Sequence, residues 1–410
     1  MAPTDSAQST LRAVATMFAA ILPDANETCF LQACLESGET GRRAWSVCED
    51  RFGDLVPAFR EDARLPRRLA PLLAAALVRN GLEAPPLLVT LLRTATLQEE
   101  LRTREYLRII VDVSSRLREA HLDFLVLNGP ALATLYDQPW LRHNHDFELL
   151  FLSHADVERG ARILEQLGAH RILPAQPAPA GSVVFLHPEG LPIGLRARLF
   201  RSPHYDLPTV DLWRRRSVVA VDRIRLDVLS PEDALLHVLA HATYSTGRVS
   251  LQWVADAWHL IRRHRELDWE RFQRTTLEAG LALVVAGMLR YLAHEVGAPV
   301  PNDVLVRAGH AMRDTSRLEC DALFAGVRAT NPGALGALLG ACTSSTERLR
   351  LIWWLLAPSP TYLRRVHREN PTAWPLLYVY RPLAFAARTL RSPRTAGNGA
   401  GRKSLAERAT

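Results

Sequence analysis

The chain has 410 residues, 48% of them hydrophobic, so it is long enough to bury one sizeable core or two. Its formal net charge is +7, but almost all of the positive charge is arginine, and no RNA-binding motif accompanies it, so a nucleic-acid partner is not expected. Lys403 is the only lysine, which disfavours phosphate loops, kinase sites and Schiff-base chemistry that need a lysine in the folded body.

The cysteines and the apolar segments indicate in which cellular compartment the protein is expected. The cysteine count is odd and no C-x-x-C pair occurs, which disfavours a disulfide framework or a zinc knuckle. The N-terminal residues lack the pattern of a signal peptide, and no apolar run reaches about 18 residues, so no transmembrane helix is expected. We therefore predict a cytoplasmic protein with reduced thiols at Cys29, Cys34, Cys48, Cys320 and Cys342.

Residues 1–120 are predicted to form a helical N-terminal region. Apolar residues recur at helical spacing over 65–80, and the prolines at 85–86 interrupt the pattern. A long, highly charged helix is expected over 97–120, with its apolar stripe packed on the sheet that follows.

Residues 121–230 alternate strand and helix patterns, which predicts an α/β (α+β) core with a small mixed sheet. A helix is expected over 154–167 and a hairpin turn at 187–190. The predicted strands are 124–128, 146–151, 182–187, 191–199 and 222–228.

The pattern becomes helical again over 231–390, and 391–410 is expected to be a disordered tail, because it lacks apolar periodicity. Two apolar-then-basic runs, 349–365 and 374–391, are expected to pack within the chain. Contact of either run with a membrane surface or a partner remains an alternative.

An acid-x-acid pair follows a loop in residues 141–151 (LRHNHDFELLF). Alternate side chains of a strand point to the same face, so Asp146 and Glu148 should project together. Two adjacent carboxylates repel unless a cation lies between them, which suits Mg²⁺ held together with substrate phosphates. In the structural alternative, Asp146 caps or pairs with Arg142, and Glu148 lies on a solvated sheet face.

A strand, a glycine turn and a helix start precede the acid pair. The predicted strand ends at Asn128, Gly129 and Pro130 form the turn, and residues 131–136 begin a helix. Free backbone N–H groups and the helix dipole at such a turn favour phosphate. Asn128 and Gly129 are therefore candidate phosphate-binding residues.

Several spaced segments together resemble the uncharacterised nucleotidyltransferase family, which belongs to the DNA-polymerase-beta-like superfamily. The resemblance spans roughly residues 100–265 and is carried by 127–133, 135–136, 141–150, 229–241 and 253–256. It implies a nucleotidyltransferase fold, a nucleoside triphosphate with Mg²⁺ as substrate, and Asp146 and Glu148 as catalytic metal ligands.

The sequence departs from the family pattern at four positions. Asn128 stands where the family has lysine, and Glu148 stands where it has a second aspartate. The third carboxylate, which in the superfamily helps to hold a second metal ion and can take a proton, corresponds to Gly194, and Arg196 replaces a histidine. Either one metal ion suffices, or another residue supplies the third oxygen, with Glu189 as a candidate.

A second candidate for the missing oxygen is Asp206. Arg142, Arg196 and Arg198 are candidates to neutralise phosphate charge. Arg196 and Arg198 share the strand face of Gly194 if the strand continues to 199. They are otherwise exposed strand residues or partners of the acid pair.

Four histidines form two further candidate groups. His237 and His241 are four residues apart on a predicted helix and so share a face. The two histidines either pack against neighbouring side chains or bind a metal ion together with Asp256. The family resemblance implies a third role, in which this helix faces the nucleotide and the histidines contact the substrate. His143 and His145 precede the acid pair. They are either candidates to contact phosphates or the acceptor, or ordinary polar loop residues.

Two functional hypotheses follow. The first is transfer of a nucleotidyl group from Mg²⁺–nucleoside triphosphate to an unknown small-molecule or peptide acceptor, in the tailoring of a natural product. The alternative is a catalytically degenerate nucleotide- or peptide-binding accessory protein of a biosynthetic pathway, which Asn128 and Gly194 favour.

Overall fold

The computed structural model describes residues 21–60, 67–172, 182–200, 207–243 and 251–313, together with the single positions 18, 205, 319, 323, 345, 349 and 378. The predicted tail lies outside the described residues, as do Asp206, Cys320 and Cys342. The two apolar-then-basic runs also lie outside them, apart from positions 349 and 378. Cys29, Cys34 and Cys48 are free thiols in the buried core of the N-terminal helices.

The N-terminal region is helical, as the sequence predicts. Its first described helix is capped by Asp24, whose side chain accepts from the backbone N–H groups of Asn26 and Glu27. The helices are α2 (Ala25–Leu35), α3 (Gly38–Phe52), α4 (Leu55–Arg60) and α5 (Ala70–Asn80), with a short 3₁₀ turn η1 (Arg67–Leu69) before α5.

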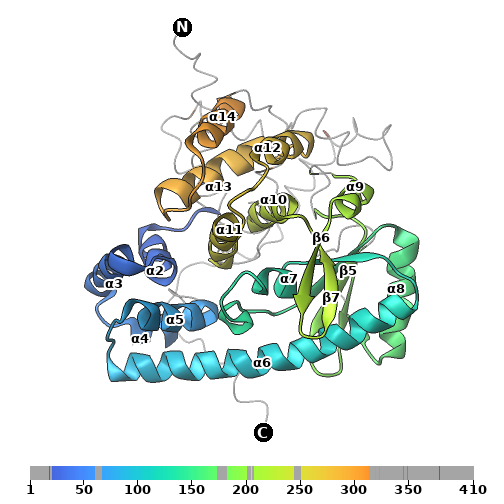
Figure 1. Cartoon of the computed structure of the whole chain (residues 1–410), viewed down its shortest axis with the longest axis horizontal. Coiled ribbons are helices and arrows are strands. Elements are labelled where there is room, and N and C mark those ends of the chain that lie inside the picture. Colours follow the sequence, from blue (N-terminus) through green and yellow to red (C-terminus); the bar gives the residue numbers. More distant parts are fainter. Residues whose placement is uncertain are drawn as a thin grey trace.

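A single long helix, α6 (Pro86–Glu119), joins this region to the sheet. It begins 11 residues earlier than predicted, because Pro86 occupies its first turn, where a proline costs no intrahelical hydrogen bond. In Figure 1 it crosses the whole width of the described fold beneath the other elements. Its C-terminal half buries Ile109, Ile110, Val113 and Leu117.

The sheet has seven strands in the order β3-β4-β5-β2-β1-β7-β6. The pairs β1–β7 and β2–β5 are parallel and the other pairs are antiparallel, which confirms the predicted mixed sheet. The strands are β1 (Phe124–Leu127), β2 (Phe147–Phe151), β3 (His170–Ile172), β4 (Ser182–Leu186), β5 (Pro192–Arg196), β6 (Ser217–Val221) and β7 (Ile224–Val228).

The edges of the sheet differ from the prediction. The edge strands β3 and β6 were not predicted, and all residues of β3 are exposed, so it carries no apolar alternation. The predicted strand 191–199 was too long, since β5 ends at Arg196 and the chain bends at 197–199. The expectation that Arg198 shares a strand face with Gly194 is therefore wrong.

Both faces of the sheet are covered. Phe124 and Val126 of β1 belong to one core with α6 and α8 (His154–Gln166), whereas Leu125 and Leu127 belong to a second core shared with the helices. The central strands β1 and β2 are thus buried on both sides, which explains their nearly continuous apolar runs.

The second core joins the N-terminal helices and the start of α6 to the helices that follow the sheet. The later helices gather on the side opposite α6 (Figure 1). Short helices connect the strands: α7 (Gly129–Ala133), η2 (Pro139–Leu141) and α9 (Thr209–Arg214). The later helices are α10 (Pro231–Ala242), α11 (Gln252–Arg263), α12 (Trp269–Glu278), α13 (Ala282–His294) and α14 (Asn302–Arg313).

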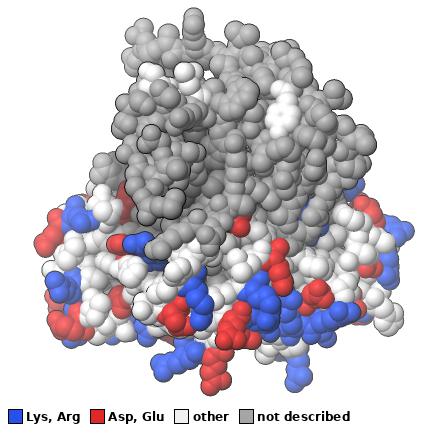
Figure 2. All heavy atoms as spheres, turned by 90° about the horizontal axis from the view of Figure 1, so that it is seen from above, with Lys and Arg blue, Asp and Glu red and all other residues white. Residues whose placement is uncertain are grey.

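The surface of the described residues carries mixed charge. Figure 2 shows basic and acidic side chains interspersed over the described part of the face in view. No helix among the described residues is both long enough and apolar enough to cross a membrane.

Candidate functional site

The turn and the acid pair lie at the same end of the sheet. Leu127, the last residue of β1, pairs with Glu148 near the start of β2, and Glu148 pairs in turn with Gly194 of β5. Asn128 directly follows β1, and Asp146 directly precedes β2. Segments that the sequence places apart are therefore neighbours at one sheet end.

Asn128 has φ +47° and ψ −128°, a left-handed backbone conformation that costs a residue with a side chain about 1–3 kcal/mol. Its side-chain Nδ2 donates to Glu148 Oε2 at 3.0 Å. A Cβ added at Gly129 would lie 3.1 Å from the carbonyl oxygen of Asp146, so the absent side chain lets the turn pack against the acid segment. The strained turn and the acid pair are in direct contact.

The two acids have different surroundings. Glu148 is 4% exposed, and its Oε1 forms an ion pair with Arg196 Nη2 while its Oε2 accepts from Asn128. The Asp146 side chain is 31% exposed, with His145 Nε2 3.8 Å from its Oδ2. The pair with Arg196 leaves Asp146 as the more accessible negative charge.

Gly194 explains how Arg196 reaches Glu148. Arg196 pairs with Leu150 in the register, two residues along β5 from Gly194, which is paired with Glu148. A Cβ at Gly194 would lie 3.7 Å from the Glu148 Cγ. The glycine thus places no side chain between Glu148 and Arg196, and an arginine supplies positive charge beside the buried carboxylate.

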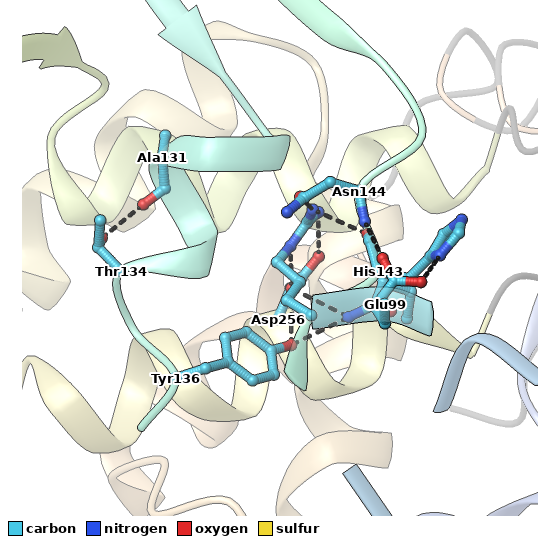
Figure 3. A network of polar contacts seen from close by, with 9 residues as sticks. Glu99, Ala131, Thr134, Tyr136, His143, Asn144 and Asp256 are labelled. Atoms are coloured by element: carbon cyan, nitrogen blue, oxygen red, sulfur yellow. Dashed lines mark hydrogen bonds and ion pairs between the residues drawn. The ribbon is translucent and has the colours of Figure 1, made fainter. Parts of the chain in front are cut away.

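A buried polar network fixes the loop that leads into Asp146 (Figure 3). Arg142, which is 6% exposed, donates through Nε and Nη2 to the two carboxylate oxygens of Asp256 in α11 at 2.8 and 2.9 Å. Its Nη1 donates to Asn144 Oδ1 at 2.7 Å, and the Tyr136 hydroxyl donates to Asp256 at 2.8 Å. The Arg142 guanidinium is thus bound by side chains of the protein itself, and Asp256 is its ion-pair partner.

Burial raises the pKa of Tyr136, and the charge of Asp256 raises it further, so the phenol remains a hydrogen-bond donor. Burial lowers the pKa of His259, whose ring lies 4.0 Å from that of Tyr136, to about 4. The tyrosine and this histidine are thus neutral at pH 7, and the negative charge of Asp256 faces Arg142.

Glu99 of α6 holds the other side of the loop. It is 5% exposed, its Oε2 lies 2.9 Å from His143 Nδ1, and its Oε1 accepts from the Asn144 backbone at 3.3 Å. Arg102 donates to the same carboxylate at 2.8 Å. The loop is therefore tied to α6 on one side and to α11 on the other, which fixes the start of β2.

The chain matches a family model described as "Uncharacterised nucleotidyltransferase" over residues 66–297, more than half of its length. The chain belongs to this nucleotidyltransferase family. Among curated proteins, none matches the sequence. A crystal structure of an antigenic nucleotidyltransferase-like protein from Paracoccidioides brasiliensis is similar at 14% identity, covering 49% of this chain and 96% of that one. Its TM-score is 0.31, too low to inform the site.

The family match includes the turn, the acid pair and the histidine pair of α10. His237 is 2% exposed, with its ring 5.8 Å from that of His241 and 6.3 Å from that of Phe200. His143 and His145 stack at 5.6 Å beside the acid segment. Substrate contacts of His145, His237 and His241 stay predictions for this member of the family.

Two other predicted site residues lie elsewhere. Glu189 forms an ion pair with Arg108 of α6, and Arg198 lies in the bend after β5. Among the described residues, no group of three or more histidine, cysteine, aspartate or glutamate side chains is arranged to hold a metal ion. Mg²⁺ is usually held by one or two carboxylates together with substrate phosphates, so Asp146 and Glu148 stay the predicted ligands of an ion that arrives with a nucleotide. Both carboxylate oxygens of Glu148 have protein partners in this structure.

The sequence carried little signal for Glu99 and Asp256. Glu99 is one of many charges on a long helix, and only its burial distinguishes it from the surface pairs along α6. The aromatic run around Asp256 was the available clue, since an acid between two buried tryptophans, Trp253 and Trp258, needs a partner.

Proposed function

We propose that this nucleotidyltransferase transfers a nucleotidyl group from a nucleoside triphosphate carrying one Mg²⁺ to an acceptor. The observation that supports it is the contact between the two halves of the site, in which Asn128 of the glycine turn donates to Glu148 of the acid pair at 3.0 Å. A turn suited to phosphate and an acid pair suited to a metal ion thus meet at one sheet end.

In the proposed reaction the acceptor oxygen or nitrogen bonds to the α-phosphorus, the bond from that phosphorus to the bridging oxygen breaks, and pyrophosphate leaves. Asp146 and Glu148 would hold Mg²⁺, which supplies charge neutralisation at the phosphate oxygens when bound. The glycine turn would offer backbone N–H groups to the phosphates. The loop tied by Arg142 and Glu99 keeps Asp146 in place.

Arg196 gives the proposed site its particular charge. Because it neutralises Glu148, the acid pair and Arg196 together carry one net negative charge. That charge suits a single divalent ion better than two. Arg196 is therefore proposed to replace part of the positive charge that a second ion would bring.

A thermal-shift experiment tests nucleotide binding. At a concentration of about 100 times its dissociation constant, a nucleoside triphosphate should stabilise the wild-type protein by about 2.7 kcal/mol in the presence of Mg²⁺. We expect Asp146→Ala to abolish this Mg²⁺-dependent shift. Asp123→Ala should retain it, because Asp123 is an exposed acid just before β1, at the opposite end of that strand.

The second candidate function is a non-catalytic accessory protein that binds a nucleotide or a peptide. The ion pair of Glu148 with Arg196 favours it, since one of the two acids is already satisfied by protein. A Mg²⁺-independent shift that Asp146→Ala leaves intact would support this reading. No shift with any nucleotide would contradict the proposed transfer.

A further inference from the structure

A cavity of about 360 Å³ opens at the same end of the sheet as the acid pair. The ends of β1 and β7, the start of β6, helix α7 and the start of α10 enclose it. Its volume lies in the range of small-molecule binding sites, roughly 300–1,000 Å³.

The cavity adjoins the candidate site through Asn128. This residue lines the cavity and also donates to Glu148 Oε2 at 3.0 Å. Ala131 of α7 and Thr134, which directly follows that helix, line it too, and Figure 3 shows them apart from Asp256. A molecule in the cavity would therefore end beside the acid pair.

The chemistry of the walls selects the kind of molecule. Among the residues that the structure describes, no aspartate, glutamate, lysine or arginine lines the cavity, and most of the described lining is aliphatic, including Leu132, Val219 and Leu229. Two histidines, His237 and His264, also line it. Burial lowers the pKa of His264, which disfavours its charged form. A triphosphate would lose its hydration here without a counter-charge, and the aliphatic walls offer a nucleobase little stacking surface.

We propose that this cavity receives the uncharged, aliphatic or alicyclic body of an acceptor alcohol and directs its hydroxyl toward Asn128 and Glu148. The proposal rests on the proposed nucleotidyl transfer and names its acceptor class. The hydroxyl oxygen bonds to the α-phosphorus, pyrophosphate leaves with the electrons of the broken bond, and the hydroxyl proton passes to water. An ammonium or phosphate acceptor is disfavoured by the uncharged walls.

Saturation-transfer NMR with cyclohexanol as the probe tests the cavity on the full chain. Cyclohexanol should bind the wild type, and filling the cavity with Ala234→Trp or Thr134→Trp should reduce the transferred signal at least about five-fold. Thr134 is exposed, so the second variant tests the cavity even if the first fails to fold. Val78→Trp is the matched control, because Val78 is 83% exposed on α5 and should bind as the wild type does.

Equal binding to wild type and both filled variants, or no binding to the wild type, would overturn the proposal. Binding of cyclohexylammonium as strong as that of cyclohexanol would overturn the uncharged acceptor class. The thermal shift of the wild type with nucleotide tests the proposed function in a separate experiment. A protein that binds cyclohexanol in the cavity but shows no nucleotide shift would keep the cavity and reject the transfer.

Discussion

Asp256→Ala should lower the free energy of unfolding by about 3–5 kcal/mol, because it leaves the buried Arg142 guanidinium without its carboxylate. Urea unfolding followed by circular dichroism measures the loss. The matched control is Asp137→Ala, which removes an exposed ion pair with Arg263 and should cost about 1 kcal/mol or less. Equal losses in the two variants would show that the buried network does not stabilise the fold.

Arg196→Ala should lower the free energy of unfolding by a similar amount, about 3–5 kcal/mol, because it leaves the buried carboxylate of Glu148 without its ion-pair partner. Adding Glu148→Gln removes that charge and should recover much of the loss. The double-mutant cycle, read by urea unfolding, gives the coupling free energy directly.

The control for this cycle is Arg214→Ala, because Arg214 is 74% exposed in its pair with Asp211 and should contribute little. A coupling free energy below about 0.5 kcal/mol would mean that Arg196 and Glu148 are energetically independent. Arg196 would then not compensate for the acid that Gly194 replaces in the family pattern.

These two ion pairs support the site in different ways. The pair of Arg142 with Asp256 joins the loop before β2 to α11, so it positions Asp146 without facing the solvent. The pair of Arg196 with Glu148 lies inside the acid pair itself and sets its charge. Loss of the first should move the acid pair, and loss of the second should change its charge.

The sequence predicted the parts of the site that are local. A buried strand ending in a glycine turn is a pattern of a few residues, and β1 and the start of α7 bear it out. Of the two acids predicted on the next strand, Glu148 lies in β2 and Asp146 directly precedes it. The family followed from the order of such segments.

Most tertiary partners could not be predicted, although the sequence left Arg196 open as a partner of the acid pair and the structure confirms that alternative. Glu148 meets Arg196 only because β2 and β5 are neighbours in the sheet, and the predicted strand around Arg196 ran three residues too far. Glu99 and Asp256 come from helices before and after the sheet, where periodicity does not tell a surface charge from a buried one. Arg142 therefore seemed available for phosphate, although its guanidinium faces Asp256.

Nucleotidyl transfer can be measured as pyrophosphate release from each nucleoside triphosphate, with an α-phosphate label followed into cyclohexanol. We expect Mg²⁺-dependent release and labelled product from the wild type, a fall of at least about 100-fold in Asp146→Ala, and unchanged rates in Asp123→Ala. Nucleotide binding without pyrophosphate release or labelled product would contradict nucleotidyl transfer and identify the site as a non-catalytic nucleotide-binding one.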